Sequence, residues 1–115
     1  MTSKTFNLIF REVDYKTFLR IKNGQKIYET RAGMPEYLDL SSGDNLIISC
    51  GADTITKTIL EAHHFKNIDE LLQKISLDDI MQQGTTREQA IEKWNSFPGY
   101  PERIAKYGII AWKLN

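Results

Sequence analysis

Several features are scarce in this 115-residue chain, and each absence excludes a class of protein. The single cysteine, Cys50, excludes a disulfide framework and a zinc site made of cysteines, and it is typical of a reducing compartment. The apolar runs are far shorter than the roughly 20 residues that cross a bilayer. The first residues also lack the apolar region of a signal peptide. We therefore expect a soluble, cytoplasmic protein without a membrane segment.

The chain also has no excess of positive or of negative charge. The 15 Lys and Arg residues balance 15 Asp and Glu residues, which excludes disorder driven by charge repulsion and a uniformly basic nucleic-acid binder. Glycine and proline are few, and no repeat, linker or low-complexity tract is present. The chain is 41% hydrophobic, with five Phe, five Tyr and two Trp residues, which is enough for a core. Residues 1–115 are therefore expected to form a single domain.

The balanced total hides an uneven distribution of charge. Residues 1–31 hold seven basic and three acidic residues, whereas the remaining residues hold eight basic and twelve acidic ones. Five of the basic residues fall between Lys16 and Arg31. This cluster is either a solvated helix face or a local patch that attracts anions, because a one-sided field steers phosphates even on a neutral protein.

The hydrophobic periodicity predicts alternating strands and short helices. Apolar residues alternate over 5–10, and the period becomes helical from Tyr15, with Asp14 as a plausible N-cap and Gly24 beyond the helix end. Capping signals mark two more helices. The expected strands are 5–10, 26–31, a hairpin of 44–50 and 54–63 around Gly51-Ala52-Asp53, and 107–114; the expected further helices are 68–75 after Asn67 and one after the capping-box spacing Thr85-Thr86-Arg87-Glu88.

This order of elements favours an α+β fold with more strands than helices. Strict alternation of strand and helix is missing, which argues against a doubly wound parallel sheet. A small, mostly antiparallel β-barrel with short helices inserted between its strands accounts for the order, and closure would remove exposed sheet edges. In that barrel we expect Lys26 to Arg31 to be an inner strand.

The adjacent histidines His63 and His64 suggest a metal site, but the geometry of a strand argues against one. Neighbouring side chains on a strand point to opposite faces, so the two imidazoles do not easily share one ion. Only Glu61 is near as a further ligand. We expect no metal and no other cofactor.

The segment that follows Gly24 carries the strongest chemistry in the chain. Lys26, Glu29 and Arg31 lie on a stretch that apolar neighbours should bury, where charged groups must pair or serve a site. Ideal alternation places Glu29 with Arg31 on one face and Lys26 with Tyr28 on the other. Convergence of Lys26 with Glu29 therefore requires a bend at the start of the strand.

Three motifs in this order resemble the ASCH family of small domains with a PUA-like barrel. The first is Gly24-Gln25-Lys26-Ile27-Tyr28-Glu29-Thr30-Arg31, which is similar to the family's pattern of glycine, lysine, glutamate and arginine. The second is Gly43-Asp44 before Asn45-Leu46-Ile47-Ile48, and the third is the closing segment from Tyr100 to Ala111. The resemblance extends over nearly the whole chain from Tyr15 onward.

The resemblance implies a cleft on the barrel wall lined by the Lys/Glu/Arg set, of a kind associated with RNA or modified nucleotides. One similar branch hydrolyses the amide of N4-acetylcytidine with a lysine and a threonine nucleophile. This chain matches that lysine with Lys26, has Glu29 at the threonine's place, and reads Met81-Gln82-Gln83-Gly84 where an acidic partner would stand.

Two functions follow, with a third option that the domain only mediates interactions. The first is binding of single-stranded RNA, a nucleotide or a modified nucleoside, with Lys26 and Arg31 on phosphate and Tyr28, Tyr100 or Trp94 stacking a base. Trp94 fits the core better, and Tyr100, between two prolines, is expected in an exposed loop as a gate. The alternative is a small hydrolase, of amidohydrolase or ribonuclease type, with Lys26 and Glu29 as its acid–base pair. The expected ligand-binding residues are Lys26, Tyr28, Glu29, Arg31 and Tyr100.

Overall fold

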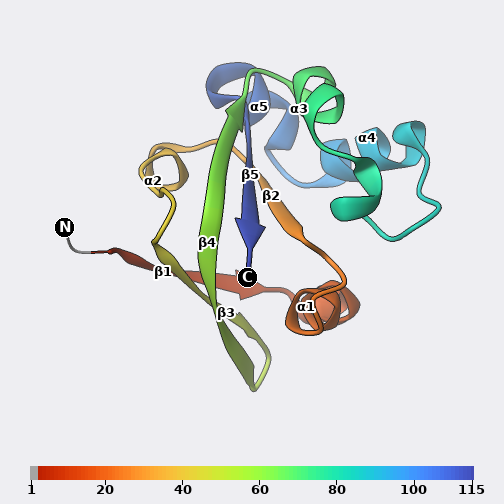
Figure 1. The fold of residues 1–115 in the computed structure, drawn as a ribbon. Helices are drawn as coiled ribbons and strands as arrows, with labels where there is room; N and C mark the ends of the chain where they lie inside the picture. The colour runs from red at the N-terminus through yellow and green to blue at the C-terminus, as the bar shows by residue number, and fades with distance from the viewer. Residues whose placement is uncertain (1–2) are drawn as a thin grey trace.

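The computed structural model describes residues 3–115 as a curled sheet flanked by short helices (Figure 1). No helix in these residues is long and apolar enough to cross a membrane. The strands are β1 (Thr5–Phe10), β2 (Tyr28–Ala32), β3 (Asn45–Cys50), β4 (Asp53–Phe65) and β5 (Ile109–Leu114). The helices are η1 (Glu12–Asp14), α1 (Tyr15–Lys22), α2 (Pro35–Leu38), α3 (Ile68–Lys74), η2 (Leu77–Asp79), α4 (Arg87–Ser96) and α5 (Tyr100–Tyr107).

The five strands form one mixed sheet in the order β1-β3-β4-β5-β2. Only β1 and β3 run parallel, and the other neighbouring pairs are antiparallel. The 13-residue strand β4 pairs with β3 through its first half and with β5 through its second, with a register shift between Ile59 and Glu61. An irregularity of this kind bends a strand and increases its twist. Strand β4 thereby curls the sheet into a half-barrel.

Each face of the half-barrel carries its own group of buried side chains. One group gathers under β1, β3 and α1, and its largest fully buried members include Phe18, Leu46 and Trp112. The other joins β5 to α3 and α4 and includes Leu71 and Trp94. Strand β5 contributes to both groups and is buried on both faces.

The structure confirms the α+β class and corrects the expected closure of the barrel. Strands β1 and β2 end the sheet and are not paired with each other, so the segment from Lys26 to Arg31 leads into an edge strand, not an inner one. Side chains connect the two edges instead: the guanidinium carbon of Arg31 lies 5.1 Å from the ring centre of Phe10, and Phe18 packs beside that ring. Helix α1 thus fills the place where a barrel would close.

Most of the local predictions hold. The strand over 5–10, the tight hairpin between β3 and β4, and the helix after Asn67 are all present, with the Asn67 side chain accepting a hydrogen bond from the amide of Glu70. Gly24 follows α1 with a φ of 76°, which glycine adopts at little cost. The helices η1, α2, η2 and α5 were not expected from the periodicity.

The capping box lies one residue later than its spacing suggested. Thr86 is the N-cap of α4, and its hydroxyl accepts from the amide of Gln89, whose side chain bonds back to the Thr86 amide. The hydroxyl of Thr85 donates to the carbonyl of Gln82 instead. Asp14 occupies the N-cap position of α1, but its carboxylate pairs with Arg11 and caps nothing.

Candidate functional site

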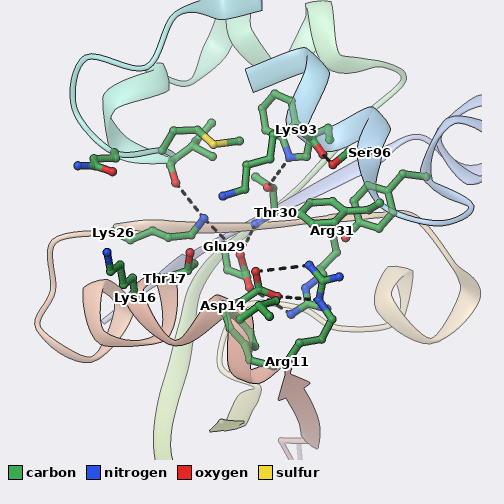
Figure 2. Close-up of a pocket in the computed structure, with 18 of the residues that line it drawn as sticks. Arg11, Asp14, Lys16, Thr17, Lys26, Glu29, Thr30, Arg31, Lys93 and Ser96 are labelled. Atoms are coloured by element: carbon green, nitrogen blue, oxygen red, sulfur yellow. Dashed lines mark hydrogen bonds and ion pairs between the residues drawn. The ribbon is translucent and has the colours of Figure 1, made fainter. Parts of the chain in front are cut away.

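A cleft of about 1020 Å³ opens beside the free edge of β2 (Figure 2). Its walls come from the end of β1, from α1, and from α4 with the segments that flank it. Six basic side chains and three acidic ones line it. The basic residues are Arg11, Lys16, Arg20, Lys26, Arg31 and Lys93, and the acidic ones are Asp14, Glu29 and Glu92. The basic cluster of the N-terminal third therefore faces a cavity.

Lys26 reaches the floor of this cleft because it lies just before β2, outside the regular alternation of the strand. Its amide and that of Gln25 both donate to the carbonyl of Arg20, at 3.0 and 2.9 Å, which fixes the turn after α1. The next amide, of Ile27, donates to the carbonyl of Asp79 at 3.1 Å. The bend that convergence required is therefore present, and the Lys26 side chain is only 7% exposed.

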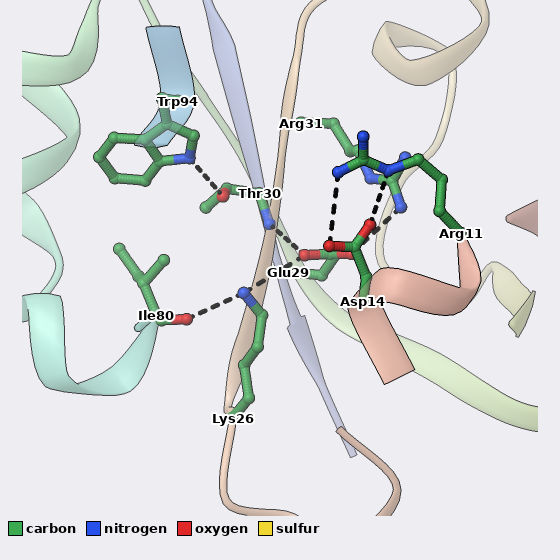
Figure 3. A network of polar contacts seen from close by, with 8 residues as sticks. All are labelled: Arg11, Asp14, Lys26, Glu29, Thr30, Arg31, Ile80 and Trp94. Atoms are coloured by element: carbon green, nitrogen blue, oxygen red, sulfur yellow. Dashed lines mark hydrogen bonds and ion pairs between the residues drawn. The ribbon is translucent and has the colours of Figure 1, made fainter. Parts of the chain in front are cut away.

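Glu29 stands at the centre of a buried polar network (Figure 3). The Lys26 ammonium lies 3.4 Å from Glu29 Oε1 and donates to the carbonyl of Ile80 at 2.9 Å. Glu29 Oε1 also accepts from the amide of Thr30 at 3.0 Å, and Glu29 Oε2 lies 3.3 Å from Nη2 of Arg31. The structure thus brings Lys26, Glu29 and Arg31 together, as the family resemblance implied, although strand alternation had left the meeting of Lys26 with Glu29 open.

The neighbouring Thr30 points to the opposite face of β2 and ties the strand to α4. Its hydroxyl accepts a hydrogen bond of 3.1 Å from the indole nitrogen of Trp94. Trp94 is 1% exposed and belongs to the core, so it has no free ring face for a base. The bond instead fixes the distance between β2 and the α4 wall of the cleft.

Burial and charge act on the two cations of the network in different ways. Burial lowers the pKa of Lys26, and the nearby Arg20 and Arg31 lower it further, although the Glu29 carboxylate opposes this shift. Burial also disfavours the charged form of Arg31, but the Glu29 carboxylate together with the nearby Tyr100 and Tyr37 outweighs it and raises the pKa of Arg31. Arg31 is therefore the permanent partner of Glu29, whereas Lys26 is the group whose proton is held less tightly.

Tyr100 lines the cleft, but as part of a helix and not of an exposed loop. It is the first residue of α5 and is half-buried, and its ring centre lies 4.9 Å from that of Phe97. The guanidinium carbon of Arg103 lies 5.4 Å from the Tyr100 ring centre. Burial raises the pKa of the Tyr100 phenol. The expected gate is thus a packed side chain of the cleft wall.

Tyr28 lies away from the cleft, which corrects its expected place among the ligand-binding residues. It is on the same face of β2 as Thr30, but unlike Thr30 it does not line the cavity. Its ring lies 6.2 Å from that of His63 on β4. Strand alternation sends Tyr28 and Glu29 to opposite faces, and Glu29 lines the cleft whereas Tyr28 does not.

The two adjacent histidines serve different neighbours, as expected for a strand. His63 Nε2 lies 2.8 Å from Glu61 Oε1, and His64 Nε2 lies 2.6 Å from the carbonyl oxygen of Tyr107. Within residues 3–115, no three His, Cys, Asp or Glu side chains are grouped closely enough to hold a metal ion.

Of the basic residues of the cleft, Lys93 was not singled out from the sequence, and Lys16 and Arg20 were noted only as members of the basic cluster from Lys16 to Arg31. Lys16 and Arg20 lie one turn apart on α1, and Lys93 lies on α4. The i,i+4 spacing of Lys16 and Arg20 placed them on one helix face. Nothing in the sequence indicated that this face borders a cavity or that Lys93 stands across from it.

No family model and no curated protein matches this sequence. Solved structures of similar fold do exist. The crystal structure of the hypothetical protein PH0355 matches with a TM-score of 0.82 and 20% identity, over 96% of this chain and 97% of that one. The solution NMR structure of protein PF0455 from Pyrococcus furiosus matches with a TM-score of 0.71 and 18% identity, over 99% of this chain and 96% of that one. These likenesses show the fold, and neither name states an activity.

Proposed function

We propose that this protein is an ASCH domain of PUA-like fold that binds a nucleotide or single-stranded RNA in the cleft beside β2. The observation that carries the proposal is the convergence of Lys26, Glu29 and Arg31 on the cleft floor. These are the residues on which the resemblance to the ASCH family rests. A structural role alone would not require them to border a cavity.

The dimensions and chemistry of the cleft support this proposal. Its volume of about 1020 Å³ is at the upper end of the range for small-ligand sites and exceeds what one nucleoside needs. Glu29 can accept from the donor edge of a base, and Lys26 can donate to a base carbonyl. The rings of Phe97 and Tyr100 border the same space, and a base would stack on them beside the guanidinium groups of Arg11 and Arg103.

A small hydrolase acting on a modified nucleoside or RNA is the second candidate. It is favoured by the burial of Lys26, which lowers its pKa, beside a carboxylate that could act as general base on a water. The water would attack the scissile amide carbon, Glu29 would take the proton of the water, and Lys26 would return a proton to the leaving amine. Against this role, three donors already engage the Glu29 carboxylate, which leaves it a weak acceptor for a water proton. We therefore favour binding over hydrolysis as the function of the cleft.

The test is a calorimetric titration of the protein with a panel of nucleosides, nucleoside monophosphates and short single-stranded RNAs. Lys26→Ala should abolish binding of the ligands that the wild type holds, and the melting temperature reports whether the variant still folds. Lys74→Ala is the matched control, since Lys74 is exposed and does not line the cleft. Chromatography of the same mixtures detects turnover, which would establish the hydrolase. A wild type that binds none of the panel would contradict the proposal.

A further inference from the structure

The cations of the cleft fall into two chemically different sets. Lys26 and Arg31 share the Glu29 carboxylate, and Arg11 pairs with Asp14 at 2.9 Å. Within residues 3–115, the other three form no ion pair and no side-chain hydrogen bond. These unpaired cations are Lys16, Arg20 and Lys93.

The unpaired cations stand on facing walls of the same cavity. Lys16 and Arg20 lie on successive turns of α1, and Lys93 lies on α4 across the cleft floor (Figure 2). Glu92 is the lining carboxylate that stays unpaired in the described part of the chain, and it offsets one of the three positive charges. An excess of positive charge therefore remains on this side of the cleft.

Among the three unpaired cations, Arg20 gives the strongest evidence for a bound anion. It is half-buried, and burial lowers its pKa without any carboxylate to restore it. Removing a guanidinium from water without a counter-ion costs free energy, and an anion bound in the cleft would offset that cost. A guanidinium also presents donors in a planar fork that fits two oxygens of a phosphate.

We infer that Arg20, together with Lys16 and Lys93, is the phosphate-binding group of the cleft, so that its ligand is a phosphorylated nucleoside or an RNA phosphodiester and not a free nucleoside. The inference rests on the proposed function and changes the expected contacts of Lys26 and Arg31. Lys26 and Arg31 flank Glu29, whose negative charge repels phosphate, so they meet the base or sugar and leave the phosphate to the unpaired set.

The experiment compares a nucleoside that the cleft holds, its 5′-monophosphate and a short single-stranded RNA that contains it. In the wild type the monophosphate or the RNA should bind at least about tenfold more tightly than the nucleoside. Arg20→Gln should remove that advantage and leave the nucleoside affinity unchanged. Preference for the monophosphate identifies a terminal phosphate as the source, and preference for the RNA identifies a phosphodiester. For RNA, each lost contact should reduce the salt slope of log affinity by about 0.7.

Lys22→Gln is the matched control, because Lys22 lies on the same helix, carries the same charge and does not line the cleft. It should leave every affinity unchanged, and the melting temperature verifies the fold of each variant. Equal affinity of the wild type for nucleoside and monophosphate would overturn the inference while the proposed function stands. Equal losses in Arg20→Gln and Lys22→Gln would overturn it as well. Absence of binding to all three ligands would remove the proposed function and the inference together.

Discussion

Glu29 is the residue on which the charge balance of the cleft floor depends. Its carboxylate is the anion shared by two cations, and its side chain is 6% exposed. A buried charge that loses its partner is destabilising because it keeps the cost of desolvation without the attraction that offset it. The network is therefore a structural element of the protein as well as the floor of the proposed site.

Replacing Glu29 by glutamine should lower the free energy of unfolding by about 3 kcal/mol, because Gln keeps the shape but leaves Lys26 and Arg31 without a counter-charge. Urea denaturation measures the loss. Glu61→Gln is the control, because Glu61 pairs with His63 and Lys113 on the surface and should cost less than about 1 kcal/mol. Equal losses in the free energy of unfolding would show that the buried ion pairs of Glu29 stabilise the protein no more than the surface ion pairs of Glu61 do.

Lys26 should make stability depend on pH in the alkaline range. Burial lowers its pKa in the folded protein below the value of about 10.4 for an unfolded lysine. Between these two values the unfolded chain binds the additional proton, so the free energy of unfolding rises with pH, by at most about 1.4 kcal/mol per pH unit. Below the folded pKa and above 10.4 or so this contribution is flat.

Urea denaturation of the wild type and of Lys26→Met from pH 7 upward isolates this effect, because the titrations of other residues are common to both. The wild type should gain stability relative to Lys26→Met as the pH rises. Lys74→Met, at an exposed lysine, should show no such trend. A difference that falls with rising pH would mean that the folded protein holds the Lys26 proton more tightly than the unfolded chain does.

The residue types of the site could be predicted, but their geometry could not. Three charged residues within six positions on an apolar stretch had to pair or serve a site, and they do pair. Whether Lys26 meets Glu29 depended on a backbone hydrogen bond to the carbonyl of Arg20, which no spacing rule reveals. The basic cluster that contains Lys16 and Arg20 was seen as a possible anion-attracting patch, but its place in a cavity with Lys93 could not be predicted, since a cavity forms between elements that are distant in the sequence.

At the scale of elements, strand β2 shows how an edge can be buried without a neighbouring strand. Arg103 of α5 donates to the carbonyls of Ala32 and Gly33, at 2.8 and 3.4 Å, and the Glu29 side chain accepts from the Thr30 amide. These side-chain bonds occupy groups that an open edge would offer to another chain. The apolar neighbours of β2 indicated burial correctly, but burial here comes from helices and not from strands on both sides.

Helix α4 carries the wall of the cleft opposite α1, and its N-terminus provides a test at this scale. Thr86→Ala should lower the free energy of unfolding by about 1 kcal/mol, because it removes the hydroxyl that accepts from the amide of Gln89. Thermal or urea unfolding measures the change. Thr85→Ala should cost less than about 0.5 kcal/mol, since its hydroxyl bonds only the carbonyl of Gln82 at an exposed turn. A larger loss for Thr85→Ala than for Thr86→Ala would show that Thr85 is the N-cap, as the sequence spacing suggested.

Strand and helix types were predictable because each depends on local periodicity, and the hairpin and the Asn67 cap were found for that reason. The short helix α2 has only four residues, too few for a hydrophobic period to appear. Closure of the sheet was not predictable, because it depends on whether α1 or a strand fills the space between β1 and β2.

At the scale of the whole molecule, the cleft explains the uneven charge of a neutral chain. Five of the seven basic residues in positions 1–31 line one cavity, from the end of β1, from α1, and from β2 and the turn before it, and α4 adds Lys93 from the far part of the sequence. The molecule has a second, smaller groove of about 410 Å³ between α3, α4 and α5, lined by Asn67, Ile91 and Ile104 among others. That groove carries no basic side chain, so it serves as an internal reference for any anionic ligand.

The most direct test is the amide ¹H–¹⁵N NMR spectrum of the wild-type protein titrated with a panel of nucleoside monophosphates and short single-stranded RNAs. The account predicts that at least one ligand shifts the amides of Arg20, Lys26, Thr30 and Lys93 in a saturable manner. The amides of Asn67 and Ile91, at the second groove, should stay in place. Shifts confined to the second groove, or a spectrum that no ligand changes, would contradict the claim that the cleft beside β2 binds a phosphorylated nucleoside or RNA.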